Sequence, residues 1–328
     1  MLGFLDPGVG MRRSMSLEFQ AGSDARRKLD DLLAKTSRTF AITIPLLPEP
    51  TQLEVTIAYL LFRVADTLED ATLWPQSRKL EELDAFARFL GRPTDSVAVQ
   101  LSNRWTIEPP VEHAGYLQLM SELPFVMQAA THLSRPSWSI IARHSARTTR
   151  GMASFVSREA DGRLGLRDIA DLKAYCYAVA GIVGEMLTEL FLLGRQQLAS
   201  VANELRADAS AFGEGLQLVN ILKDSDADVL EGRRYLPVGT DPARVFELAF
   251  SGLDAASRYC VRLEAAGAER GLLASTALPI VLARATLERL QQMGPGAKLG
   301  HAQVAVLVRR LQVAVAGGRI GELVTKQT

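Results

Sequence analysis

The chain has 328 residues, of which 48% are hydrophobic and 23% are charged, and this composition excludes a largely disordered protein. Its 37 Lys and Arg residues balance 37 Asp and Glu residues, so no overall field would attract nucleic acid or anionic lipid. We therefore expect no nucleic-acid partner. The two cysteines, Cys176 and Cys260, lack CxxC spacing, which speaks against a zinc site or a disulfide framework.

The start of the sequence carries no clear targeting signal, because an acid and Pro and Gly breaks interrupt MLGFLDPGVGMRRS where a signal peptide needs an apolar run. No stretch reaches about 18 uninterrupted apolar residues, so no membrane-spanning helix is expected. The sequence predicts a cytoplasmic protein with a flexible N-terminus over residues 1–20 and a single helical domain over residues 21–328.

Apolar residues recur at helical spacing through most of the chain, and no convincing run of alternating β-branched residues is bounded by turns. The predicted fold class is therefore all-α, with breaks where Pro and Gly cluster and with no long linker or internal repeat. In chain order, the predicted helices cover residues 22–35, 48–72, 76–90, 113–131, 136–158, 167–194, 197–232, 241–267, 269–293 and 300–317.

A polar stripe crosses the second predicted helix, where four polar residues follow i, i+4, i+7, i+11 spacing and share one face: Tyr59, Arg63, Asp66 and Asp70. Placing such groups amid Leu, Phe and Val costs desolvation energy unless the face lines a wet cavity or meets counter-charges. Asp66 and Asp70 also repel each other, and a divalent cation removes that repulsion. A lone DxxxD pattern is more often a solvated helix end.

A second polar stripe follows the same pattern at spacings of three, four and four, in Gln217, Asn220, Asp224 and Asp228. Two such stripes can face each other across a helical bundle. Oxygen ligands without His or Cys select a hard ion, and Mg²⁺ commonly bridges carboxylates to substrate phosphates. The sequence therefore predicts a magnesium site that binds an organic diphosphate. The sequence contains neither a Walker A nor a GxGxxG pattern, so a nucleotide bound through a glycine-rich loop is disfavoured.

Four segments together resemble the ordered motifs of squalene and phytoene synthases, and the likeness extends over roughly residues 30–290. They are SRTF at 37–40, DTLED at 66–70, YCYAVAGIVG at 175–184, and NILKD at 220–224 followed by RRYLP at 233–237. The resemblance implies a one-domain isoprenoid-synthase helical bundle with a central cavity.

The resemblance also assigns roles to individual residues. Mg²⁺ and the diphosphates would be held by Asp66 and Asp70 on one wall and by Asp224 and Asp228 on the other, with Glu69 as an additional ligand. Phosphate oxygens would be bound through charge-assisted hydrogen bonds by the basic residues Arg38, Arg63, Lys223 and Arg233, beside Gln217 and Asn220. For Arg233, a surface arginine without a partner is the alternative.

Tyr175 matches a tyrosine that lies near the reacting carbons in the family and is implicated in proton transfer or cation stabilisation. A core tyrosine with a satisfied hydroxyl is the alternative. Gly181 and Gly184 follow it inside a helix, where they cost helix stability but let a ligand or another backbone approach.

The second motif departs from the family pattern, because Ala227 stands where an acid usually precedes the final Asp and an extra acid, Asp226, lies one step earlier. On a helix this step moves the charge by about 100°. We keep Asp224 and Asp228 as ligands and expect Asp226 to be solvated.

The chemistry that the resemblance implies is the head-to-head condensation of two molecules of farnesyl diphosphate to presqualene diphosphate. The sequence YLLFR followed by DTLED is closer to that of squalene synthases, which reduce this intermediate with NADPH. The segment 297–304 loosely resembles the flap of squalene synthases, and Lys298 is the basic residue in it that matches the flap. The apolar stretches 53–65, 178–193 and 272–283 are candidates for the channel of the prenyl tails.

Several alternatives remain open at this point. Within the enzyme class they are a dehydrosqualene or phytoene synthase, or an enzyme that stops at presqualene diphosphate or forms hydroxysqualene. A non-catalytic assembly factor on the same fold is disfavoured, because both DxxxD patterns are intact. Prenyl chain length, final product, oligomeric state and peripheral membrane contact for product release stay undetermined.

Overall fold

The computed structural model describes residues 24–37, 39–160 and 163–325. The predicted flexible segment 1–20 and the predicted phosphate ligand Arg38 therefore lie outside the described residues. Within the described ranges the chain folds almost entirely into helices, which confirms the all-α prediction.

The first helix covers residues 24–36. The elements that follow are α2 (Phe40–Thr43), the short 3₁₀ helix η1 (Ile44–Leu46), α3 (Thr51–Glu69), α4 (Gln76–Gly91), α5 (Asp95–Ile107), α6 (Ala114–Ser121), α7 (Leu123–Ala130), α8 (Arg135–Val156), β1 (Leu164–Gly165), α9 (Ile169–Cys176), the π-helical turn η2 (Tyr177–Gly181), α10 (Ile182–Leu192), the 3₁₀ helix η3 (Gln196–Val201), α11 (Ala202–Leu230), β2 (Arg233–Arg234), α12 (Pro242–Ala265), α13 (Arg270–Met293), α14 (His301–Gly317) and α15 (Ile320–Thr325).

Some boundaries differ from the predicted helices. The predicted helix over 113–131 is two helices, because Pro124 lies in the first turn of α7 and cannot continue the hydrogen-bond ladder of α6. The helices α2, α5 and α15 were not predicted. In α5, several β-branched residues lower helix propensity, and the helix is instead fixed by the Thr94 cap and by burial of Leu101 and Trp105.

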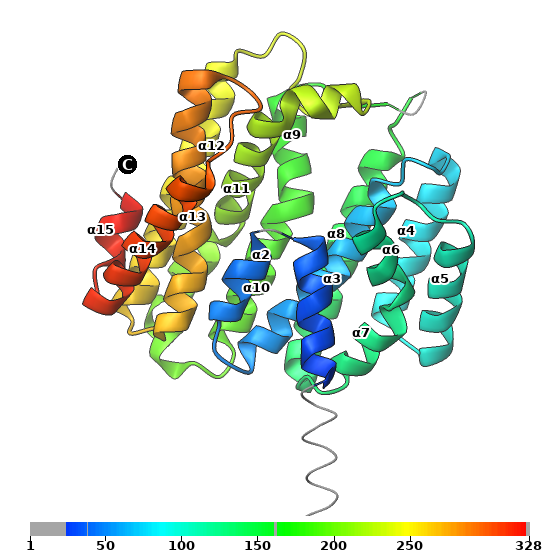
Figure 1. Ribbon diagram of the computed structural model, residues 1–328, viewed down its shortest axis with the longest axis horizontal. Coiled ribbons are helices and arrows are strands. Elements are labelled where there is room, and N and C mark those ends of the chain that lie inside the picture. Colours follow the sequence, from blue (N-terminus) through cyan, green and yellow to red (C-terminus); the bar gives the residue numbers. More distant parts are fainter. Residues whose placement is uncertain (1–23, 38, 161–162, 326–328) are drawn as a thin grey trace, which may run out of the picture.

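Figure 1 shows α3 to α8 on one side of the molecule and α11 to α15 on the other, with α9 and α10 between them. α10 packs against both α8 and α11, and α11 in turn packs along α12 and α13. The two halves therefore meet along α10. This places α3, which carries the first polar stripe, across the molecule from α11, which carries the second.

Glycines set the close approach of α10 and α11. A Cβ atom on Gly184 would lie 2.0 Å from the carbonyl oxygen of Ala209, and one on Gly213 would lie 2.1 Å from that of Ala180. Only glycine fits at such contacts. The sequence predicted that Gly184 lets a ligand or another backbone approach, and in the structure the backbone of α11 approaches it.

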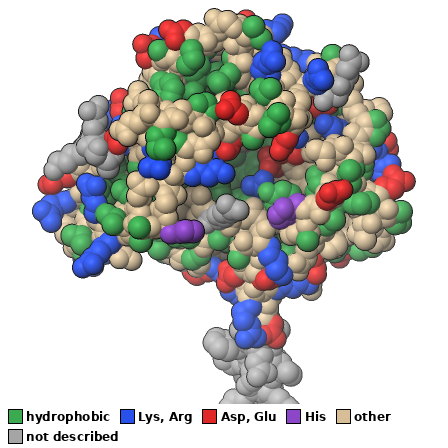
Figure 2. All heavy atoms as spheres, turned by 45° about the horizontal axis from the view of Figure 1, so that its top comes forward, with side chains coloured by type: hydrophobic (Ala, Val, Ile, Leu, Met, Phe, Trp, Pro, Cys, Tyr) green, Lys and Arg blue, Asp and Glu red, His purple; other side chains and the backbone are tan. Residues whose placement is uncertain are grey.

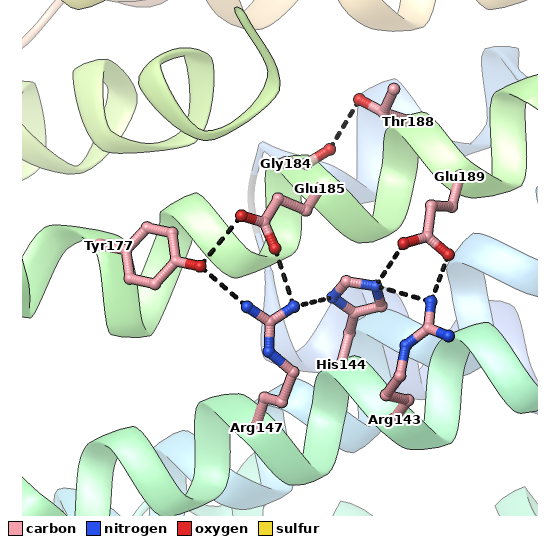
Figure 3. A network of polar contacts seen from close by, with 8 residues as sticks. All are labelled: Arg143, His144, Arg147, Tyr177, Gly184, Glu185, Thr188 and Glu189. Atoms are coloured by element: carbon pink, nitrogen blue, oxygen red, sulfur yellow. Dashed lines mark hydrogen bonds and ion pairs between the residues drawn. The ribbon is translucent and has the colours of Figure 1, made fainter. Parts of the chain in front are cut away.

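A π-helical turn interrupts the long helix at Tyr177–Gly181, two residues after Tyr175. Such turns hold one extra residue and often mark functional sites. The turn is fixed from the outside by Arg147 of α8, which donates hydrogen bonds to the Tyr177 hydroxyl and to Glu185, both at 2.8 Å (Figure 3). Arg147 also donates to Nδ1 of His144, whose Nε2 lies 3.1 Å from Glu189. Burial lowers the pKa of His144, which fits a neutral ring in this network.

Two helical stretches, 169–192 and 270–293, are long and apolar enough to cross a membrane by length and composition alone. The sequence analysis expected no membrane-spanning helix because it required an uninterrupted apolar run. A high mean hydropathy is a different criterion, since it allows isolated polar residues within the stretch. In the fold, 50% and 56% of their most apolar windows are buried among the other helices. A core helix of a bundle passes the same test, so the two stretches are weak indicators of a membrane span.

Candidate active site

A cavity of about 300 Å³ lies between the two halves of the bundle. Its border includes Arg63 and Asp66 from α3 and Gln217 and Asn220 from α11. The cavity thus lies between the first parts of the two polar stripes, whereas Asp70, Asp224 and Asp228 are not among the residues that line it. In Figure 2, charged side chains surround the hollow in the middle of the displayed face, and hydrophobic side chains lie within it.

The walls of this cavity are mostly apolar. Each of the three stretches predicted for prenyl tails contributes to them, as Phe62, Val183 and Pro279 illustrate. Two further wall segments, 40–47 and 212–216, were not predicted. A pocket of this size and lining suits an apolar ligand that is fixed by a few polar groups at one end.

On the first wall, Arg63 is the centre of a polar cluster. Its Nε donates to the Tyr59 hydroxyl at 3.2 Å, its Nη1 pairs with Asp66, and its guanidinium lies 5.2 Å from the ring centre of Tyr116. The Tyr59 hydroxyl donates to the carbonyl oxygen of Thr36 at 2.8 Å. Burial opposes the charge of Arg63, but Asp66 and the two tyrosines raise its pKa above the ordinary value.

Three carboxylates crowd at the end of α3, at Asp66, Glu69 and Asp70. Glu69 is 5% exposed, and its Oε1 has no hydrogen-bond partner. Burial, with repulsion from Asp70 and Asp66, raises the pKa of Glu69 well above its usual range. Burial and Asp66 raise the pKa of Asp70 to about 7, although Arg233 pairs with it at 2.6 Å.

On the second wall, Lys223 Nζ lies 3.2 Å from both Asn220 Oδ1 and Asp224 Oδ2. Burial and repulsion from Asp224 raise the pKa of Asp228 to about 6, and Arg233 opposes this shift. Asp226 is exposed, as expected from its rotation around the helix.

Arg233 therefore interacts with carboxylates from both walls, through its ion pair with Asp70 and its field at Asp228. The alternative of a surface arginine without a partner is wrong, since only 16% of its side chain is exposed. Its backbone is held by the parallel pairing of β1 and β2, in which Leu164 N donates to Gly232 O at 3.1 Å and Leu166 N donates to Arg234 O at 3.0 Å. Two residues per strand leave no periodic signal in the sequence.

Tyr175 is buried, and its hydroxyl donates to the Tyr235 hydroxyl at 3.1 Å, while the two rings stack with centres 4.7 Å apart. Burial, followed by the charge of Glu69, raises the pKa of Tyr175 well above its usual range. Tyr175 thus lies beside the carboxylates of α3 rather than among the residues that border the apolar cavity. Sequence reasoning missed Tyr235 and Tyr116; Tyr235 lies in the RRYLP segment that had already identified Arg233.

The donors fit magnesium held jointly with a substrate, because Glu69 has an unpaired buried oxygen and its neighbours repel one another. Mg²⁺ typically takes one or two protein carboxylates and completes its shell with water and phosphate oxygens. Across 24–37, 39–160 and 163–325, no three or more His, Cys, Asp or Glu side chains form a ready metal cage. Asp66, Asp224 and Asp70 pair instead with Arg63, Lys223 and Arg233, respectively.

Lys298, the predicted contact for NADPH, is exposed on the segment after α13. The amide of Gly296 donates to the carbonyl oxygen of Lys223 at 2.8 Å, so this segment is attached to α11 at the aspartate motif. The structure thus brings the segment of Lys298 to the same end of α11 as Asp224.

We expect the stability of the metal-free protein to fall as the pH rises through the titration of Asp70 and Asp228. Their ordinary pKa is 3.8 and their folded values are about 7 and about 6, so the folded chain binds more protons in this window. The stabilisation is complete below the ordinary value and is lost as the pH passes the folded values. Because 37% of the Asp70 side chain is exposed, solvent screening limits the effect.

Thermal unfolding in EDTA at several pH values between about 4 and 8 measures this contribution. Asp70→Asn should flatten the decline of the melting temperature with pH, whereas Asp226→Asn, at an exposed position on the same motif, should leave it unchanged. Parallel profiles for wild type and Asp70→Asn would contradict the assignment.

The family model for squalene/phytoene synthase matches residues 33–240, which is more than half of the chain. The squalene synthase of Schizosaccharomyces pombe is 30% identical over 212 residues, or 64% of this chain and 44% of the relative. The "Botryococcus squalene synthase" of Botryococcus braunii is 26% identical over 200 residues, or 61% and 39%. The matched part thus spans less than half the length of these relatives.

Solved structures share the fold. TcSQS in complex with the ligand BPH1237 superposes with a TM-score of 0.70 at 24% identity, covering 92% of this chain and 96% of that one. A dehydrosqualene synthase in complex with a ligand gives 0.58 at 18% identity, covering 91% and 99%. With a matching model over most of the helical core and two DxxxD stripes, the chain belongs to the squalene/phytoene synthase family.

Proposed function

We propose that this protein joins two molecules of farnesyl diphosphate head to head, in a Mg²⁺-dependent reaction that gives presqualene diphosphate. The observation that carries the proposal is the apolar cavity of about 300 Å³ whose lining includes Arg63 and Asp66 on one wall and Asn220 on the other. A prenyl diphosphate has this division, with an apolar tail and a strongly charged head. The squalene synthases among the relatives support the same reaction class.

Substrate binding follows from the two parts of the site. Apolar side chains such as Phe62, Val183 and Phe191 would bury the prenyl tails, at roughly 25 cal/mol for each Å² removed from water. Arg63, Lys223 and Arg233 would exchange their present carboxylate partners for diphosphate oxygens, which form strong charge-assisted hydrogen bonds with guanidinium and ammonium groups.

The residues that would hold magnesium are Asp66, Glu69, Asp70, Asp224 and Asp228. When bound, the metal supplies positive charge that neutralises the leaving diphosphate. The chain's own basic residues act in the same direction, because they stabilise negative charge as the allylic C–O bond of the first substrate breaks. The apolar walls exclude water from the resulting carbocation.

In the condensation, the C2–C3 double bond of the second substrate attacks C1 of the first, and proton loss closes the cyclopropane ring. The Tyr175 hydroxyl stays protonated because its pKa is raised, so it would accept the released proton only while passing its own proton along its hydrogen bond to Tyr235, or it would stabilise the cation without transfer. Its hydrogen bond to Tyr235 orients that hydroxyl. We therefore assign Tyr175 to proton transfer or cation stabilisation and Tyr235 to its positioning.

As a finer proposal, the protein reduces presqualene diphosphate to squalene with NADPH. The support is the squalene-synthase-like wording around Asp66 and the attachment of the Lys298 segment to α11 beside Lys223. Dehydrosqualene, phytoene and hydroxysqualene are the alternative final products, and a product analysis distinguishes them from squalene.

Asp66→Asn and Asp224→Asn should each lower turnover of farnesyl diphosphate by about two orders of magnitude or more, because each removes a carboxylate that would hold the Mg²⁺ whose charge stabilises the leaving diphosphate. Asp226→Asn is the matched control, since this acid is exposed on the same helix, and it should keep near-normal turnover. Diphosphate release, measured with Mg²⁺ and with EDTA, reads out the reaction, and circular dichroism checks the fold. Full activity in both active-site variants, or in EDTA, would refute the metal-dependent mechanism. Absence of any product from the wild type would favour a non-catalytic role.

Tyr175→Phe should slow condensation far more than it lowers the melting temperature, because it removes one hydroxyl and leaves the stacking on Tyr235 in place. Tyr235→Phe should have a smaller effect on rate, since Tyr175 keeps its own hydroxyl but loses the acceptor that orients it. Single-turnover kinetics measures the effect of each variant on the rate of condensation, and thermal unfolding measures its effect on stability. A Tyr175→Phe protein that loses stability and keeps its rate would show that Tyr175 is a core residue.

With farnesyl diphosphate and Mg²⁺ alone, we expect presqualene diphosphate or its rearranged alcohols to accumulate, because the final cation lacks a hydride donor. Adding NADPH should convert the output to squalene, as gas chromatography of extracted products would show. Lys298→Ala should weaken the use of NADPH more than the first half-reaction. A product mixture indifferent to NADPH would exclude reductive squalene synthesis and leave the condensation proposal standing.

A further inference from the structure

A second cavity, of about 410 Å³, lies on the outer side of α12 and α13, next to α15. These helices form one edge of the molecule in Figure 1. The cavity is lined by Asp254, Ser257, Arg258, Val261, Arg262, Arg284 and Thr325. None of these residues borders the cavity of the candidate active site, which α12 and α13 reach through Tyr259 and Thr276. The same two helices therefore separate two cavities on opposite faces.

The lining of the outer cavity is strongly basic. Three arginines line it together with a single carboxylate, that of Asp254. Behind the wall, Asp208 of α11 accepts from Arg258 at 3.0 Å and also pairs with Arg262. One carboxylate thus serves two arginines. Each guanidinium has five N–H donors, more than this one carboxylate can satisfy.

Arg284 shows that the cavity is a built site rather than a group of surface charges. The residue is 6% exposed, and its Nη2 donates to Asp254 at 2.6 Å and to the Ser257 hydroxyl at 3.0 Å. Its Nε is buried and has no hydrogen-bond partner within the described chain. A buried donor without an acceptor costs about 1–3 kcal/mol, so the wall holds this charged side chain at a cost to the empty protein.

We propose that this outer cavity binds a phosphate group, presented either by a free small phosphate or by the headgroup of a lipid. Arg258 and Arg262 lie one helical turn apart on α12 and Arg284 approaches from α13, so a ligand in the cavity meets guanidinium groups from two helices. A tetrahedral phosphate offers oxygens in several directions, whereas a planar carboxylate can satisfy only one or two forks. The inference does not rest on the proposed reaction, because the two cavities share no residue.

Arg258→Gln is the primary test variant, because 54% of this side chain is exposed and Asp208 keeps Arg262 as its partner. Arg244→Gln is the matched control, since it removes an exposed arginine of the same helix that pairs with Glu247 away from the cavity. Arg284→Lys keeps the positive charge but removes the Nε donor. Arg233→Gln removes a basic group of the candidate active site and leaves the outer cavity intact.

Isothermal titration of the full chain with inorganic phosphate, in EDTA, measures binding. Arg258→Gln and Arg284→Lys should each weaken this binding by about tenfold or more, the equivalent of one charge-assisted hydrogen bond of about 1.4 kcal/mol. Arg244→Gln and Arg233→Gln should retain it. Circular dichroism confirms that each variant is folded, and Arg258→Gln alone is sufficient for the test if Arg284→Lys does not fold.

Vesicles of phosphatidylcholine, with and without phosphatidic acid, distinguish the two sources of phosphate. Binding of inorganic phosphate that is lost in Arg258→Gln supports a soluble ligand, and binding only to vesicles that contain phosphatidic acid, with the same loss, supports a lipid headgroup. No binding to either probe overturns the proposal. It is equally overturned if Arg258→Gln binds like the wild type, or if Arg244→Gln loses as much affinity.

Discussion

Repulsion among carboxylates at the end of α3 is the constraint on which the candidate active site depends. Asp66, Glu69 and Asp70 lie within one turn, and Glu69 is buried with an unpaired oxygen. In the metal-free chain this repulsion is relieved partly by protonation, seen in the raised pKa of Asp70, and partly by the ion pair with Arg233. The same arrangement, unfavourable alone, would become favourable with the cations and the diphosphate of the proposed reaction, because each carboxylate would then have a positive partner. The site is thus prepared for a ligand at a cost to the empty protein.

The position of Arg233 depends in turn on contacts made outside the polar stripes. Pairing of β1 with β2 holds the segment that follows α11, and this segment carries both Arg233 and Tyr235. Tyr235 then stacks on Tyr175, which lies just before the π-helical turn. Close packing at Gly184 and Gly213 brings that part of the chain against α11. These backbone contacts therefore fix where Arg233, Tyr235 and Tyr175 lie relative to α11.

The bundle also keeps two polar regions apart by using both faces of α12. Tyr259 borders the inner cavity and donates or accepts a hydrogen bond with Thr188 at 3.0 Å, while its neighbour Arg258 faces the outer cavity. Adjacent residues on a helix point about 100° apart, so a single helix can serve both sites without mixing their charges. A ligand in one cavity and a substrate in the other would be separated by the thickness of the α12 and α13 layer.

By itself, the sequence determined the all-helical class and the two polar stripes, because both are periodic patterns within single helices and side-chain direction along a helix is a local property. It also supplied three of the stretches that line the inner cavity, and the exposed position of Asp226. Only the tertiary structure decided the partner of Arg233, the Tyr175–Tyr235 pair, the β1–β2 pairing and the approach of Gly184 to Ala209. Most of these contacts join residues from separate segments of the chain, and a periodic pattern carries no information about which segments meet. The short helix α5 belongs with them, because burial of Trp105 against other helices outweighs its weak local propensity.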